Sequence, residues 1–201
     1  MQIKIAKDYG EMSRLAADMV SQLVESKPDA VLGLATGSTP IGLYEELVKR
    51  HKAGLDFSQV TTFNLDEYCG LDGDHPASYN YYMWEHLFSK INISRDRVNI
   101  PNGAASDPEE ESRRYEARIA EAGGIDLQIL GIGHNAHIGF NEPGTPFGTT
   151  TSLVKLAPAT IKANARFFER EEDVPREAIS MGIKSIMQSR CIVLLANGEG
   201  K

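Results

Sequence analysis

The fold class follows from one segment, Val31-Leu32-Gly33-Leu34-Ala35-Thr36-Gly37-Ser38-Thr39-Pro40. Its first four residues are apolar without alternation, which is typical of a strand covered on both faces in a parallel sheet. The hydroxyl-bearing residues, the glycine and the proline that follow indicate a turn into a helix, with Thr39 as its cap and Pro40 in its first turn. A strand that enters a helix in this way predicts an α/β protein.

Similar strand and helix patterns alternate along the rest of the chain. We expect strands over 3–6, 30–35, 60–65, 97–100, 125–132, 151–156 and 191–196. We expect helices over 12–24, 40–53, 78–88, 107–122 and 175–187, the first of them with an apolar stripe along one face. No linker, repeat or charge block divides residues 1–201, so the sequence predicts a single domain folded as a three-layer α/β sandwich.

Composition and charge exclude several functional classes. The chain has 201 residues, of which 41% are hydrophobic and 24% charged, as in an ordinary globular protein. Its longest apolar run, 192–196, is far shorter than the roughly 20 residues of a membrane span. The net charge of −7 argues against a nucleic-acid partner. Two distant cysteines, Cys69 and Cys191, predict a reducing, cytoplasmic location rather than a disulfide framework.

The loop after the second expected strand has the residues of an anion site. Thr36, Ser38 and Thr39 supply hydroxyls, and Gly37 lets backbone N–H groups turn toward a ligand at a helix N-terminus. A phosphate is the natural occupant of such a site. An ordinary strand-to-helix turn would use the same residue types.

Two adjacent carboxylates follow the third expected strand, in Asn64-Leu65-Asp66-Glu67-Tyr68. Alternation along an extended chain would turn only one of them into a given pocket, where it could act as a base. Acidic residues also cap helices and fill turns. Cys69 beside them is interpreted as a small buried side chain rather than a nucleophile.

The segment after the fifth expected strand is rich in chemically active residues: Gly131-Ile132-Gly133-His134-Asn135-Ala136-His137-Ile138-Gly139-Phe140-Asn141-Glu142-Pro143-Gly144. His137 is suited to proton transfer near neutral pH, and Glu142 could orient it. A metal held by both histidines and Glu142 is disfavoured because no His-Glu-x-x-His pattern is present. The glycines do not form a dinucleotide fingerprint, and a structural role remains open for either histidine.

Two cations occur further along the chain. Arg166 and Lys201 could neutralise a phosphate held by the Thr36 loop, although each alone could equally be a solvated surface residue. Together with that loop they indicate a small anionic metabolite.

Residues 34–40, 64–68 and 131–143, as quoted above, resemble the glucosamine-6-phosphate deaminases of the glucosamine/galactosamine-6-phosphate isomerase family. The resemblance extends from Gly33 to Lys201 in the family's order. The related 6-phosphogluconolactonases carry Asp-Glu-Arg at the second segment, so Tyr68 favours the deaminases.

The resemblance implies a modified Rossmann-like α/β/α fold, mostly parallel, and conversion of glucosamine 6-phosphate and water to fructose 6-phosphate and ammonia without metal or other cofactor. His137 would open the sugar ring, with Asn135 and Glu142 holding the imidazole, and Asp66 would move the proton from C2 to C1. The substrate and its phosphate would be held by Thr36, Gly37, Ser38, Thr39, Glu67, Arg166 and Lys201.

This sequence departs from the family's pattern in three places. Asn135 replaces an aspartate found in some members. Ser152 and Val154 replace basic residues of the members regulated by N-acetylglucosamine 6-phosphate, which predicts an unregulated monomer or small homo-oligomer. The family also continues past the phosphate lysine with at least a helix and a strand, whereas this sequence ends at Lys201.

Two alternatives remain at this point. Another sugar-phosphate isomerase or a lactonase on the same fold would release no ammonia. A non-catalytic sugar-phosphate sensor is a different class of protein, but a sensor has no need for Asp66 and His137 together, and no DNA-binding segment is evident.

Overall fold

Strand β1 (Val31–Leu34) lies at the centre of a five-stranded sheet, and all four of its residues are buried. The computed structural model describes residues 2–165, 168 and 170–201. The strands follow the order β4 (Val98–Asn99), β2 (Thr61–Asn64), β1, β5 (Leu127–Leu130) and β8 (Cys191–Leu194). Every neighbouring pair is parallel, which confirms the predicted parallel sheet.

The order of the strands creates a crevice between β1 and β5. From β1 the chain moves outward to β2 and β4, and it then returns to the other side of β1 as β5. The loops that leave β1 and β5 therefore diverge, and open α/β sheets bind ligands at such a switch point, outside the carboxyl ends of the strands. The two loops that the sequence singles out, 35–40 and 131–139, both start there.

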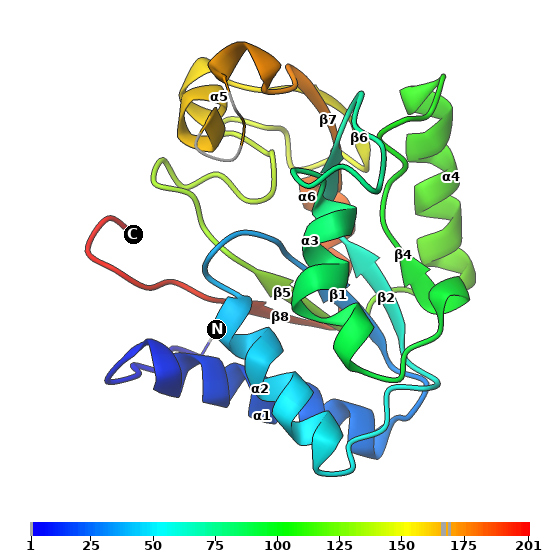
Figure 1. Ribbon diagram of the computed structural model, residues 1–201, viewed down its shortest axis with the longest axis vertical. Helices are drawn as coiled ribbons and strands as arrows, with labels where there is room; N and C mark the ends of the chain where they lie inside the picture. The colour runs from blue at the N-terminus through cyan, green and yellow to red at the C-terminus, as the bar shows by residue number, and fades with distance from the viewer. Residues whose placement is uncertain (1, 166–167, 169) are drawn as a thin grey trace.

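Helices cover both faces of this sheet (Figure 1). Leu32 and Leu34 of β1 belong to one core, and Val31 belongs to a second core on the opposite face. The first core is shared with α1 (Tyr9–Ser26), α2 (Ile41–Lys52) and α3 (Tyr79–His86), and the second with α4 (Pro108–Glu121) and α6 (Ile183–Met187). This is the predicted three-layer sandwich. Within the residues described, no helix combines the length and apolar character needed to cross a lipid bilayer.

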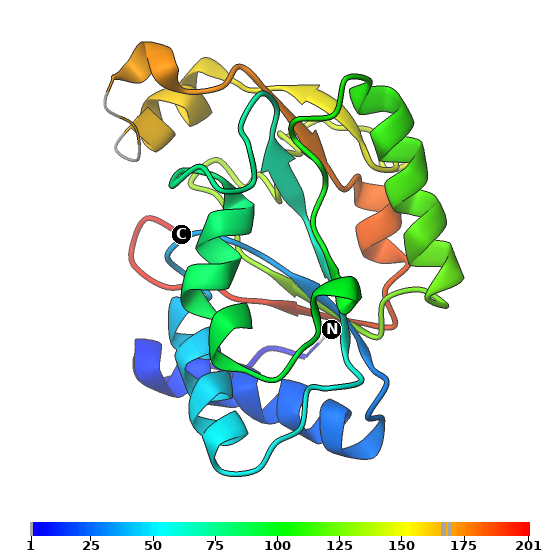
Figure 2. The same ribbon diagram turned by 45° about the vertical axis from the view of Figure 1, so that its right-hand side comes forward.

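A second, antiparallel sheet extends beyond the carboxyl end of β2 (Figure 2). Its strands follow the order β3 (Asp66–Tyr68), β7 (Glu177–Ser180) and β6 (Ser152–Lys155). Leu65 alone connects β2 to β3, and Asp66 pairs with Ser180 of β7. The position of Asp66 is therefore fixed by both sheets. A third core, which includes Ile161 of α5 (Pro158–Asn164), packs against this small sheet.

The structure corrects several local predictions. Residues 3–6 form no strand, and the side chains of Ile3 and Ile5 are 76% and 94% exposed. The helix expected over 175–187 is wrong, because Ala178 and Ile179 are fully buried between two neighbouring strands as part of β7, and only the short α6 follows. The sequence also did not predict β3 and α5. Short 3₁₀ helices occur at Phe88–Lys90, Arg95–Arg97 and Glu171–Asp173.

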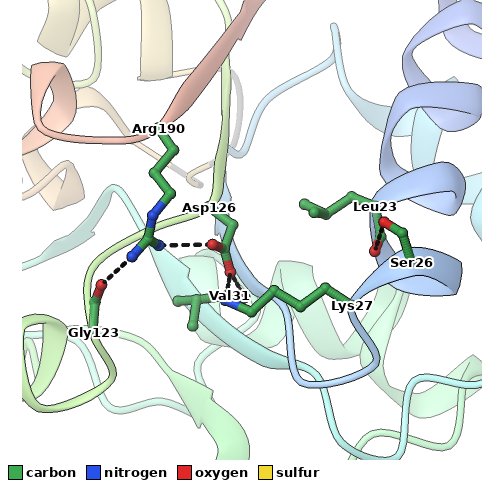
Figure 3. A network of polar contacts seen from close by, with 7 residues as sticks. All are labelled: Leu23, Ser26, Lys27, Val31, Gly123, Asp126 and Arg190. Carbon is green, nitrogen blue, oxygen red and sulfur yellow. Dashed lines mark hydrogen bonds and ion pairs between the residues drawn. The ribbon is translucent and has the colours of Figure 1, made fainter.

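An ionic network ties the elements together at the amino ends of the parallel strands (Figure 3). Asp126, which directly precedes β5, accepts hydrogen bonds from Lys27 Nζ and Arg190 Nη1, both at 2.7 Å, and from the backbone N–H of Val31 at 2.8 Å. Its side chain is only 7% exposed. The network joins α1, β1, β5 and β8 at the end of the sheet opposite to the crevice.

Candidate active site

A cavity of about 580 Å³ lies at the crevice. Its lining comes from the loop after β1, the start of β3, the loop after β5, helix α5 and Lys201. The predicted residues that line it are Thr36, Gly37, Ser38, Thr39, Asp66, His134, Asn135, His137 and Lys201. The structure thus gathers most of the predicted site around one cavity.

The loop over Thr36–Thr39 forms one wall. Gly37 has φ +92°, a left-handed conformation that favours glycine. Helix α2 begins at Ile41 with Pro40 as its cap residue and without a side-chain cap, so the predicted capping by Thr39 is wrong. The hydroxyl of Thr39 is consequently not used by the helix and lines the cavity.

Asp66 lies at the base of the cavity and is 6% exposed. Burial, and secondarily the neighbouring charge of Glu67, raises the pKa of Asp66 to about 8. Gly139, at φ +57°, passes so close that a Cβ on it would lie 3.2 Å from Asp66 Oδ2. The loop after β5 and the carboxyl group are therefore in direct contact.

Glu67 does not join Asp66 at the cavity. Its carboxylate accepts the backbone N–H groups of Tyr68 and Tyr79 at 2.9 Å and of Asn80 at 2.8 Å. Burial raises the pKa of Glu67, and these hydrogen bonds oppose the rise. In this geometry Glu67 anchors the N-terminus of α3 and does not line the cavity, so its predicted contact with substrate stays a prediction.

A chain of hydrogen bonds leads from His137 away from the cavity. His137 Nδ1 lies 2.6 Å from Asn135 Oδ1, and Asn135 Nδ2 donates to Glu142 Oε2 at 2.6 Å. The other oxygen of Glu142 accepts from Thr160 Oγ1 of α5 at 2.9 Å. Burial lowers the pKa of His137, Glu142 raises it, and electrostatic repulsion from Lys201 and from the His134 ring lowers it further. Glu142 thus acts on the imidazole through Asn135.

Lys201 and Arg166 are the two cations predicted to bind the phosphate. Lys201 lines the cavity, and its ammonium group donates to the carbonyl oxygen of Ile132. Arg166 lies outside the described residues.

Cys69 lies apart from this cavity and lines another hollow on the small sheet. Burial raises the pKa of its thiol to about 11, which disfavours the thiolate. Both cysteines are free thiols. Among the described residues, no three His, Cys, Asp or Glu side chains are arranged to hold a metal ion.

Sequence reasoning missed three further groups of the site. Tyr79, Thr160 and Asn164 all line the cavity. Tyr79 also stacks on Phe140 with an interplanar angle of 12°, and burial raises the pKa of its hydroxyl, with a smaller contribution from Tyr68. The helix predicted over 78–88 did place Tyr79 at the start of a helix, with Ser78 as the N-cap of α3, but no sequence signal indicated that Tyr79 lines the cavity.

Comparisons with known proteins agree with this fold and motif order. The family model described as glucosamine-6-phosphate isomerases/6-phosphogluconolactonase matches residues 9–201. Glucosamine-6-phosphate deaminases of Thermoanaerobacter sp. (strain X514) and Clostridioides difficile (strain 630) are 56% and 53% identical over 202 residues, covering 100% of this chain and 80% and 81% of those proteins.

Solved structures of known proteins share this fold. A monomeric glucosamine-6-phosphate deaminase aligns with a TM-score of 0.94 and 47% identity, over 96% of this chain and 81% of that one. The 6-phosphogluconolactonase from Trypanosoma cruzi, at 19% identity and a TM-score of 0.77 over 100% of this chain and 83% of that one, shares the fold. Because the family model matches residues 9–201, this chain belongs to the glucosamine-6-phosphate isomerase/6-phosphogluconolactonase family.

Proposed function

We propose that this protein is a glucosamine-6-phosphate deaminase, which converts glucosamine 6-phosphate and water to fructose 6-phosphate and ammonia. The observation that carries the proposal is that Asp66, His137 and the Thr36–Thr39 loop line one cavity. A base, a proton shuttle and an anion site then act on one small molecule. Relatives that carry this name are 52–57% identical over the whole of this chain.

The phosphate end of the substrate binds at the Thr36–Thr39 loop. The loop offers hydroxyls and backbone N–H groups at the N-terminus of α2, and the ammonium of Lys201 faces the same cavity. Arg166 remains a predicted second cation. Fixing the phosphate holds C1 and C2 of the sugar against the acid–base groups and supplies the orientation that speeds the reaction.

His137 opens the sugar ring. Because Asn135 Oδ1 accepts the proton on Nδ1, the neutral imidazole keeps a lone pair on Nε2, which takes the proton of the O1 hydroxyl. The resulting imidazolium returns a proton to the ring oxygen as the C1–O5 bond breaks. The imidazolium is stabilised through Asn135 by the carboxylate of Glu142.

Asp66 then moves a proton between neighbouring carbons. Its carboxylate removes the C2 proton while a proton passes from the C2 ammonium to O1, which gives a neutral enolamine. The protonated Asp66 then returns the proton to C1, which leaves a protonated imine at C2. Addition of water to this imine and loss of ammonia give the ketose. A carboxyl group with a raised pKa is a suitable base, and the ammonium at C2 of the substrate supplies a cation that favours its ionised form. Every step is a proton transfer or hydrolysis, so no cofactor is required.

The proposed setting is that of a catabolic enzyme of the reducing cytoplasm, as the free cysteines and the bacterial relatives suggest. We further propose a monomer or small homo-oligomer, for which the monomeric relative is the support.

A coupled assay for ammonia release from glucosamine 6-phosphate tests the function. Asp66→Asn should abolish release and retain binding of the phosphosugar, whereas Asp29→Asn, an exposed carboxylate outside the cavity, should leave release unchanged. His137→Gln should lose more activity on the cyclic sugar than on an open-chain analogue. Binding without turnover by the wild-type chain would support a sensor, and hydrolysis of 6-phosphogluconolactone without ammonia release would support a lactonase.

A further inference from the structure

Tyrosine hydroxyls from the first three helices bind the backbone carbonyl groups of the phosphate loop. Tyr82 of α3 donates to Gly37 O at 2.7 Å. Tyr9 of α1 is shared between Ser38 O and Thr39 O, at 3.1 Å each. On the strand side of the loop, Tyr44 of α2 donates to Ala35 O at 2.5 Å.

These contacts have a consequence for the opposite side of the loop. In a trans peptide the C=O of one residue and the N–H of the next point in opposite directions. Fixing the carbonyls of Gly37 and Ser38 on the helices therefore turns the N–H groups of Ser38 and Thr39 away from the helices. In the part of the chain that the structure describes, neither N–H has a protein acceptor. Both residues line the cavity, whereas Tyr9 and Tyr82 do not.

Tyr9 is held in place by a close approach between α1 and α2. Its hydroxyl also accepts the N–H of Gly42 at 2.7 Å. A Cβ at Gly42 would lie 2.4 Å from Ser13 Oγ and 2.9 Å from Cε1 of Tyr9, so glycine makes room for both side chains of α1. Burial raises the pKa of Tyr82, and the hydroxyl of Tyr9 raises it further. The second effect is expected because both hydroxyls bind the same loop and lie near each other.

Tyr82 links the loop to the other end of the site. It lies three residues after Tyr79, and residues three apart share one face of a helix. Tyr79 lines the cavity near Asp66, and Glu67 anchors the backbone where this helix begins. Helix α3 thus connects the strand that carries the base to the loop that binds the phosphate.

We propose that Tyr9 and Tyr82 are positioning residues that hold the phosphate loop in its ligand-binding conformation before the substrate arrives. The proposal rests on the proposed function, because it takes the loop as the phosphate end of the site. Pre-organised donors bind an anion without the cost of ordering the loop. Loss of either hydroxyl should weaken binding of the phosphate group while leaving the proton-transfer groups at Asp66 and His137 unaffected.

The experiment measures the affinity for inorganic phosphate by calorimetry, and kcat and KM for glucosamine 6-phosphate. Tyr9→Phe and Tyr82→Phe should each raise the Kd for phosphate and the KM about fivefold, as expected for one net hydrogen bond, with kcat unchanged. The matched control is Tyr81→Phe on the same helix, because Tyr81 is 43% exposed and does not contact the loop through a hydrogen bond in the described residues. Its constants should match those of the wild type.

A second variant guards against a purely structural explanation. Gly42→Ala keeps both hydroxyls but places a methyl group against Ser13 Oγ and the ring of Tyr9, which shifts α1 from α2, so it should reproduce the rise in Kd seen in Tyr9→Phe. Unchanged Kd in both Phe variants, or a fall in kcat as large as the rise in KM, would overturn the proposal. Wild-type protein that releases ammonia yet binds no inorganic phosphate would also overturn it while leaving the proposed function intact.

Discussion

Nδ1 of His137 and Oδ1 of Asn135 are 2.6 Å apart, and the partner of Asn135 on its other side decides which atom carries the proton. Glu142 offers only acceptors, so the amide of Asn135 turns Nδ2 toward it and Oδ1 toward the ring. The proton of neutral His137 therefore lies on Nδ1, and Nε2 is the basic nitrogen. A neutral amide transmits the charge of Glu142 more weakly than direct contact would.

Asn135→Asp should raise the pKa of His137, because it places a negative charge next to the ring. We expect the pKa of the His137 imidazole to move upward by about one pH unit. The measurement is an NMR titration of the imidazole. Asn102→Asp, outside the cavity, serves as the control for the added charge. An unchanged titration of His137 would show that residue 135 does not tune the ring.

Asp66 should make the protein less stable as pH rises. Its pKa is about 8 in the folded protein against an ordinary value of 3.8, so between these values the folded state retains a proton that the unfolded state has lost. The stability is fully present below about pH 4 and is lost as pH rises through 8. Asp66→Asn removes this dependence and should be more stable than the wild type at pH 8, by on the order of 3 kcal/mol, but not at pH 4.

Urea unfolding of both proteins across this range provides the measurement. The informative quantity is the difference in unfolding free energy between variant and wild type at each pH. A difference that stays constant from pH 5 to pH 8 would mean that Asp66 ionises normally in the folded protein. Asp66→Asn should also be inactive. The wild-type protein is therefore less stable than this variant at pH 8 because it carries the carboxyl group that acts as the base.

Glu67→Ala should destabilise the protein by about 3 kcal/mol, since one buried and two partly buried backbone N–H groups lose their acceptor. The matched control is Ser78→Ala, which removes the side-chain cap of the same helix from the N–H of Tyr81 and should cost about 1 kcal/mol. Urea unfolding at pH 7 measures both. Equal losses would contradict the anchoring role of Glu67.

The sequence was sufficient to predict the central sheet and its loops for a physical reason. Uninterrupted apolar runs such as those of β1 and β5 occur where a strand is covered on both faces, and the residues that follow such strands meet at one edge. The convergence of Asp66, His137 and the Thr36–Thr39 loop followed from that rule. Alternation along the strand also predicted that only one carboxylate of the Asp66-Glu67 pair would face the pocket.

Other features left no local signal in the sequence. The transition from β2 to β3 at Leu65 involves no glycine or proline, so the two strands looked like one strand and a loop. A segment as short as the four residues Glu177–Ser180 does not distinguish strand from helix by periodicity. The contacts of Tyr9 and Tyr82 with the phosphate loop join residues 29 to 45 positions apart, and only the tertiary structure brings them together.

The Asp126 network drawn in Figure 3 should control stability without affecting catalysis. It lies at the amino ends of the parallel strands, and the cavity lies at their carboxyl ends. Burial alone would raise the pKa of Asp126, but hydrogen bonds from Lys27 and Val31 and the charges of Lys27 and Arg190 lower it. A lowered pKa contributes stability above the ordinary pKa of an aspartate, and this contribution is lost as pH falls through the folded-state value. Asp126→Asn removes the charge of a buried carboxylate that accepts charge-assisted hydrogen bonds from the partly exposed Lys27 and the exposed Arg190, and it should cost about 2 kcal/mol at pH 7.

Urea unfolding at pH 7 and near pH 3 tests the prediction, with ammonia release per folded molecule as the second readout. The loss should shrink at the lower pH, where protonation removes the charge from the wild-type side chain as well. Asp18→Asn breaks the more exposed ion pair with Arg50, and it should cost less than about 1 kcal/mol at either pH. If Asp126→Asn instead lowered kcat when all of the protein is folded, the two ends of the sheet would be coupled, and stability at Asp126 would not be separate from catalysis.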